Sequence, residues 1–77
     1  MIASKIKSIM KDKHITNVQL AKYLGMSPQS LSNKFYRDSF SSQDLITILD
    51  YLDCELVILS KPDIRVILSL DDIESDM

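Results

Sequence analysis

The stretch LGMSPQSLSNKF, residues 24–35, constrains the fold more than any other part of this 77-residue chain. It contains Gly25, the only glycine in the sequence, and Pro28 follows three positions later. Glycine favours the left-handed backbone conformation at which many helices end. Ser27 is a good N-cap, and proline suits the first helical position because no N–H is needed there. The pattern therefore predicts two short helices joined by a tight turn.

Apolar residues at helical spacing predict four helices, over residues about 2–13, 17–24, 28–36 and 42–53. Thr16 with Gln19 has the spacing of a capping box at the second helix. Phe35 is predicted to face the core, which leaves Tyr36 facing solvent. The other residues expected on the apolar stripes are Ile2, Ile6, Ile9, Met10, Val18, Ala21, Leu24, Leu31, Leu45, Ile48, Leu49 and Leu52.

After residue 54 the residue types change from helical to strand-forming. The segments ELVILS and IRVILSL are rich in β-branched residues, and KPD between them is typical of a turn. We expect a β-hairpin over about 55–70, with strands near 55–60 and 64–70, followed by a frayed acidic tail at 71–77. The predicted class is mainly α, a four-helix domain with a C-terminal β-hairpin, in a single domain over residues 1–77.

The charge of the chain is unevenly distributed. The net charge is −2, but residues 1–37 carry seven basic side chains against one acidic, a balance of +6. Residues 38–77 carry two basic side chains against ten acidic, a balance of −8. Such asymmetry predicts one basic face, and a phosphate backbone responds to that local field.

Several other function classes lack support in the sequence. No apolar run is long enough for a membrane span. The single cysteine, Cys54, allows no internal disulfide and suits a reducing compartment, so we expect a cytoplasmic protein. No nucleophile–base pair and no metal-ligand spacing is present, and we therefore expect neither an enzyme nor a cofactor, metal or small-molecule ligand.

The two central helices have the features of a helix-turn-helix. Ala21 is small where the two helices would cross, and Leu31 would hold the second helix on the core. The remaining face of that helix is polar, and amide side chains there are suited to reading base edges in a major groove. That face carries Gln29, Ser30, Ser32, Asn33 and Lys34.

The stretch QLAKYLGMSPQSLSNKF resembles the helix-turn-helix of Cro and phage-repressor-like regulators, and the similarity covers roughly residues 3–59. It is similar in particular to small phage-type members from low-GC Gram-positive bacteria or their mobile elements. The resemblance implies a lambda-repressor-like fold and a sequence-specific DNA-binding transcriptional regulator, acting as a repressor on double-stranded DNA. The matching positions are Gln19, Ala21, Gly25, Leu31, Asn33, Lys34 and Phe35.

Carried over to this chain, the resemblance makes residues 28–36 the recognition helix, with base contacts from Pro28, Gln29 and Asn33. Pro28 departs from the pattern, since it offers only an apolar contact such as one to a thymine methyl group. Gln29 and Asn33 can each pair with adenine. The full set of expected DNA-binding residues is Gln19, Ser27, Pro28, Gln29, Ser30, Ser32, Asn33, Lys34, Tyr36 and Arg37.

Both faces of the expected hairpin carry aliphatic side chains, and such faces are usually covered. One hypothesis is a homodimer interface that includes Val57, Leu59 and Ile67 and sets two recognition helices on a pseudo-palindromic operator. The alternative is a hairpin that folds back on the helices. A second functional hypothesis is a protein-interaction module of antitoxin or anti-repressor type, with the acidic C-terminal half binding a partner.

Overall fold

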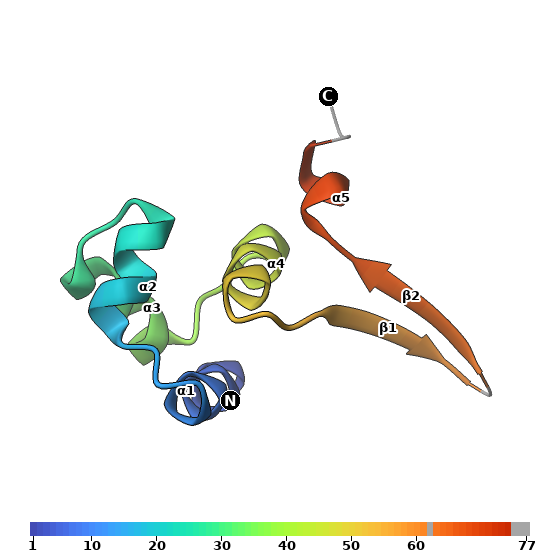
Figure 1. Ribbon diagram of the computed structural model, residues 1–77, viewed down its shortest axis with the longest axis horizontal. Helices are drawn as coiled ribbons and strands as arrows, with labels where there is room; N and C mark the ends of the chain where they lie inside the picture. The colour runs from blue at the N-terminus through green and yellow to red at the C-terminus, as the bar shows by residue number, and fades with distance from the viewer. Residues whose placement is uncertain (62, 75–77) are drawn as a thin grey trace. The chain divides into compact units, whose positions relative to one another are not determined.

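The structure of the protein, a computed structural model, describes residues 1–61 and 63–74. These form a mainly helical fold with a C-terminal antiparallel hairpin, which confirms the predicted class (Figure 1). Two compact units divide the chain, Met1–Ser41 and the residues from Ser42 onward. The elements are α1 (Ile2–Asp12), α2 (Asn17–Leu24), α3 (Pro28–Arg37), α4 (Ser42–Tyr51), β1 (Leu56–Ser60), β2 (Ile64–Leu68) and α5 (Leu70–Glu74).

In the first unit, α3 packs against both α1 and α2. Phe35 is buried, and its ring meets that of Phe40 edge-to-face at 5.4 Å between centroids. Phe40 thus anchors the loop after α3 in the core of this unit. The buried residues of the three helices are Ala3, Ile6, Met10, Leu20, Ala21, Leu31 and Phe35.

The turn between α2 and α3 has the predicted chemistry. Gly25 has φ 72° and ψ 30°, and its N–H donates to Lys22 O at 3.2 Å. The Met26 N–H donates to Ala21 O at 3.0 Å, which completes a Schellman motif. A Cβ added at Gly25 would meet no atom within 4 Å. Glycine is therefore favoured here by the backbone conformation rather than by a lack of space.

Some predicted stripe positions are wrong. Val18 is 61% exposed and Ile2 is 45% exposed. Leu20 and Ala21 are the buried pair of α2, so its core face is rotated from the predicted one. In α1 the small side chain of Ala3 is buried in place of Ile2. A periodicity of 3.6 residues over such short helices allows more than one apolar stripe, and packing selects between them.

In the second unit, α4 packs against β1 and α5. Ile46, Ile48 and Leu52 are buried, whereas the predicted core residues Leu45 and Leu49 are half-buried. The burial of Ile46 was not predicted. Among the described residues, none of the helices combines the length and the apolar character that a membrane span requires.

The hairpin pairs Leu56 with Leu68 and Ser60 with Ile64. The second strand ends at Leu68, two residues earlier than predicted. Residues 70–74 form α5, so the prediction of a frayed tail is wrong for this part, while residues 75–77 lie outside the described residues. The Ser69 N–H donates to Asp72 Oδ2 at 2.8 Å, a helix-starting contact that ends the strand.

Candidate nucleic-acid interface

The α3 helix has one buried and one exposed side. Leu31 is fully buried and Phe35 is 3% exposed, which confirms both as core residues. Tyr36 is 87% exposed, as predicted, and Lys34 is half-buried. Because Leu31 and Phe35 hold one side against the core, the polar side is presented outward. The exposed residues of this helix are Pro28, Gln29, Ser30, Ser32, Asn33, Tyr36 and Arg37.

Two of the predicted DNA-binding serines hold the start of α3. The Ser27 hydroxyl oxygen accepts a hydrogen bond from the Ser30 backbone N–H at 3.1 Å. The same hydroxyl donates to Ser30 Oγ at 2.9 Å. These two hydrogen bonds at the N-cap fix where α3 begins, and Pro28 stays exposed in its first turn.

The two amides expected to read bases are bonded to each other. Gln29 Nε2 donates to Asn33 Oδ1 at 3.2 Å, one helical turn along α3. Both side chains are exposed. The bond leaves Gln29 Oε1 and one Gln29 N–H, together with both Asn33 N–H groups and the second lone pair of Asn33 Oδ1, as hydrogen-bonding groups for a ligand.

A residue that sequence reasoning did not select, Asn17, joins α2 to α3. Its Nδ2 donates to Pro28 O at 3.1 Å and to Ser32 Oγ at 3.3 Å. Asn17 lies three positions before Leu20 on the buried face of α2. The three-residue spacing between Asn17 and Leu20 could have indicated that Asn17 lies on the buried face. The predicted apolar stripe of α2 instead contained Val18, so Asn17 was not selected.

Gln19 forms the predicted capping box. Its Oε1 accepts from the Thr16 N–H at 2.8 Å, and Thr16 Oγ1 accepts from the Gln19 N–H at 3.1 Å. The side chain is exposed. Since the amide oxygen serves the helix cap, the NH₂ group is the part of Gln19 suited to a phosphate.

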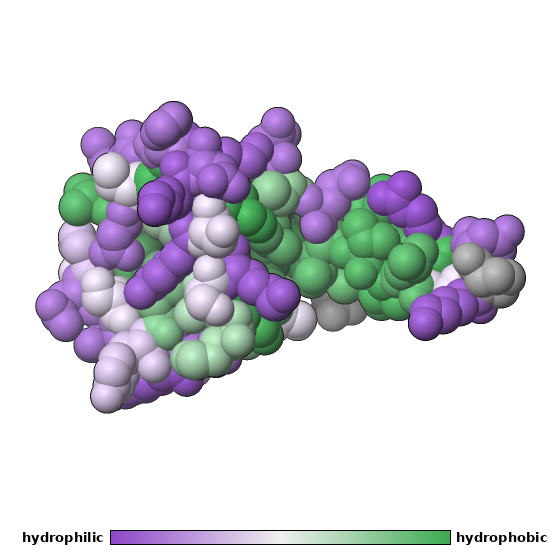
Figure 2. All heavy atoms as spheres, turned by 90° about the horizontal axis from the view of Figure 1, so that it is seen from below, coloured by the Kyte–Doolittle hydropathy of each residue, from purple (hydrophilic) through white to green (hydrophobic). Residues whose placement is uncertain are grey.

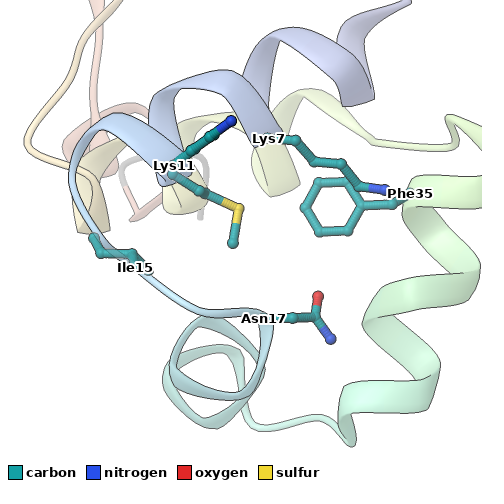
Figure 3. Close-up of a pocket in the computed structure, with 6 residues that line it drawn as sticks. Lys7, Lys11, Ile15, Asn17 and Phe35 are labelled. Atoms are coloured by element: carbon teal, nitrogen blue, oxygen red, sulfur yellow. The ribbon is translucent and has the colours of Figure 1, made fainter.

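A pocket of about 250 Å³ lies between α1, the first turn of α2 and the end of α3 (Figure 3). Lys7 Nζ is 5.3 Å from the centroid of the Phe35 ring. Lys11 follows one turn later on α1, so two ammonium groups border this hollow beside Asn17. Sequence reasoning had treated both lysines as part of the general basic charge. The lining residues are Lys7, Met10, Lys11, Ile15, Asn17 and Phe35.

The described residues contain no group of three or more His, Cys, Asp or Glu side chains arranged to hold a metal ion. The polar groups gathered at α2 and α3 are instead amides, hydroxyls and cationic side chains. Amides and hydroxyls hydrogen-bond base edges and phosphates, while cations attract the phosphate backbone.

Comparison with known families supports this description of the site. No curated protein and no solved structure matches the chain. The model of the Cro/C1-type helix-turn-helix DNA-binding domain matches residues 5–57, which is more than half of the chain and includes α2 and α3. The chain therefore belongs to the Cro/C1-type helix-turn-helix family, and it is a DNA-binding regulator.

Proposed function

We propose that this regulator is a sequence-specific transcriptional repressor that reads the major groove with α3. The observation that carries the proposal is the two-sided character of this helix. Leu31 and Phe35 are buried, while Gln29 and Asn33 are exposed beside each other one turn apart. A helix of this kind fits a major groove, where amides can distinguish the bases by their donor and acceptor patterns.

Phosphate contacts flank the base-reading residues in this proposal. Gln19 lies in the first turn of α2, where helix N–H groups and side chains meet phosphates. Lys7 and Lys11 border the neighbouring pocket and add positive charge there. Such contacts set the register of the protein on DNA without reading sequence. The remaining phosphate or groove-edge residues are Ser27, Ser32, Lys34, Tyr36 and Arg37.

The proposed active form is a homodimer assembled through the hairpin. Val57 pairs with Ile67 and Leu59 with Arg65, so these side chains share one face. Leu59 is 64% exposed and Ile67 is 48% exposed. Hydrophobic side chains gather over the hairpin, at the right of the view in Figure 2. A two-stranded hairpin is marginally stable by itself, and a second copy would cover its aliphatic side chains.

Two copies also account for specific binding. Two base-reading side chains contribute about 1 to 3 kcal/mol each to discrimination, which is a small total for one half-site. A dimer would place a second recognition helix in the next major groove, about 34 Å along the DNA. The operator is then pseudo-palindromic, and its occupation blocks transcription in the cytoplasm without an effector or cofactor.

The test is selection of bound duplexes from a random pool, at about 50 mM and about 150 mM salt, to separate phosphate attraction from base reading. Enrichment of a two-fold symmetric motif at both salt concentrations is expected. Retention that depends on salt alone, without a motif, would contradict the proposal and direct attention to a protein partner.

The dimer is tested separately by light scattering at micromolar concentrations. Leu59→Lys and Ile67→Lys are expected to reduce the molar mass from dimer to monomer, since each places a charge in the apolar interface. Val18→Lys is the matched control, because Val18 is 61% exposed and lies on α2 rather than on the hairpin. A monomeric wild-type protein would overturn the dimer.

A further inference from the structure

The pocket between α1, the first turn of α2 and the end of α3 lies wholly within the first unit. Its apolar lining comes from Met10, Ile15 and Phe35. Its volume of about 250 Å³ is just below the range of sites for drug-sized ligands, about 300 to 1,000 Å³. The pocket therefore suits a small molecule, such as one aromatic ring with a short side chain.

Asn17 supplies a hydrogen-bond acceptor to this pocket. Its Nδ2 donates to Pro28 O at 3.1 Å and to Ser32 Oγ at 3.3 Å, which directs the NH₂ group to α3. Figure 3 shows the amide oxygen turned toward the pocket instead. That oxygen accepts no hydrogen bond from the described residues, and the side chain is half-buried. An N–H or O–H group of a ligand would satisfy it.

Lys7 and Lys11 supply positive charge at the border of the pocket. They lie one turn apart on α1, and their flexible stems allow both ammonium groups to approach one anionic group. Within the described residues, neither lysine forms an ion pair with a carboxylate. Lys7 Nζ lies 5.3 Å from the centroid of the Phe35 ring, so positive charge and apolar lining adjoin. The pocket thus complements an anion with an apolar body.

We propose that this pocket binds a small aromatic carboxylate with an N–H or O–H donor, and that the bound molecule releases the protein from DNA. The carboxylate pairs with the two lysines, and the donor bonds to Asn17 Oδ1. The ring packs against the apolar lining, where it can meet Phe35 edge-to-face. A rigid ring is favoured over an alkyl chain because it loses less conformational entropy on binding.

The release of DNA rests on the proposed function, in which Lys7 and Lys11 add positive charge for phosphates. A carboxylate paired with these lysines competes with the phosphate backbone for the same ammonium groups. Operator binding itself needs no effector in that proposal, and the ligand acts in the opposite direction. By linkage, the ligand and DNA weaken the binding of each other by the same factor.

The binding site is tested without DNA, by titrating the full chain with 4-hydroxyphenylacetate and following the backbone amide NMR signals. Shifts are expected in α1, the first turn of α2 and the end of α3, with a dissociation constant of about 1 to 10 mM for so small a ligand. Phenylacetate, which lacks the donor, should bind about twofold to tenfold more weakly. The neutral 4-hydroxyphenethyl alcohol should bind about threefold to thirtyfold more weakly. Equal binding of the three compounds, or shifts confined to the hairpin, would overturn the proposal.

Two lysine variants test the anion contacts in the same titration. Lys7→Met and Lys11→Met should each weaken binding of 4-hydroxyphenylacetate by about twofold to fivefold. Lys22→Met is the matched control, because Lys22 is exposed on α2 and does not line the pocket. Thermal unfolding checks that each variant keeps its fold. Unchanged binding by both pocket variants would exclude the lysines from the site.

The effect on DNA is measured with the selected duplex at constant ionic strength, where sodium chloride replaces the carboxylate salt in the reference. At about ten times its dissociation constant, 4-hydroxyphenylacetate should lower the apparent DNA affinity by about tenfold. Binding of the ligand without any effect on DNA affinity would refute the release. If the protein selects no duplex, the proposed function fails, while the titration without DNA still decides the ligand site.

Discussion

The carboxylate of Asp38 accepts a hydrogen bond at 2.6 Å from the backbone N–H of Ala3, 35 positions earlier in the chain. The N-cap residue of α1, Met1, makes no side-chain cap bond. Asp38 thus supplies to α1 the acceptor that its own N-cap lacks. Its backbone has φ 54° and ends α3, so one residue caps the start of one helix and the end of another.

This dual role predicts a graded loss of stability at Asp38. Asp38→Ala should lower the free energy of unfolding by about 1 to 2 kcal/mol, because it removes the cap and its charge near the α1 dipole. Asp38→Asn should cost about half as much, since asparagine keeps an acceptor and tolerates the left-handed backbone. Urea unfolding at fixed protein concentration measures both. Asp63→Asn, an exposed carboxylate in the second unit, controls for net charge. Equal losses for Asp38→Ala and this control would contradict the capping role.

We predict that backbone conformation alone limits which residue can replace Gly25 in the turn before α3. Gly25→Ala should cost about 1 to 2 kcal/mol, the typical penalty of a left-handed residue with a Cβ, and Gly25→Asn should cost less. His14, after α1, has a similar φ of 59°, so His14→Gly should be neutral or stabilising. Chemical unfolding compares the three variants. A loss at Gly25→Asn as large as at Gly25→Ala would point to crowding instead.

Asn17 connects α2 to α3 by hydrogen bonds, so replacing it should weaken DNA binding without altering the preferred DNA sequence. Asn17→Ala removes the bonds to Pro28 O and Ser32 Oγ, which hold the first turns of α3. We expect a loss of about 0.5 to 1.5 kcal/mol in stability and a weaker affinity for the selected operator. Duplex titration and repeated selection measure the two effects. The neighbouring Val18→Ala should alter neither strongly, since Val18 is exposed. A changed motif for Asn17→Ala would show that Asn17 reads bases itself.

Removing the charge of a lysine beside the pocket should change the salt dependence of DNA binding. Lys7→Met keeps the aliphatic stem next to the Phe35 ring and removes the charge. If Lys7 neutralises one phosphate, the slope of log binding constant against log salt should decrease in magnitude by about one, equally for all sequences. Titrations at several salt concentrations measure it. Lys61→Met, in the hairpin turn, should leave the slope unchanged. An unchanged slope for Lys7→Met would remove Lys7 from the interface.

The local features of this chain were predictable from sequence. Gly25, the cap at Ser27 and the capping box of Thr16 with Gln19 depend on a few neighbouring residues, and each occurs as predicted. The division of α3 into Leu31 and Phe35 on one side and Tyr36 on the other was equally clear. These features follow from backbone preferences and from spacing within one or two helical turns.

Long-range packing selects which of two neighbouring faces of each short helix is buried and which distant groups form hydrogen bonds. Leu20 rather than Val18 faces the core, because packing against α3 selects one of two possible stripes. The Asp38 bond to Ala3 spans 35 positions, and no local pattern indicates it. The bond from Asn17 to Ser32 likewise requires α2 and α3 already in place. The helix-turn-helix and the polar side of α3 follow from local sequence patterns, whereas long-range packing determines how the side chains on that polar side are held.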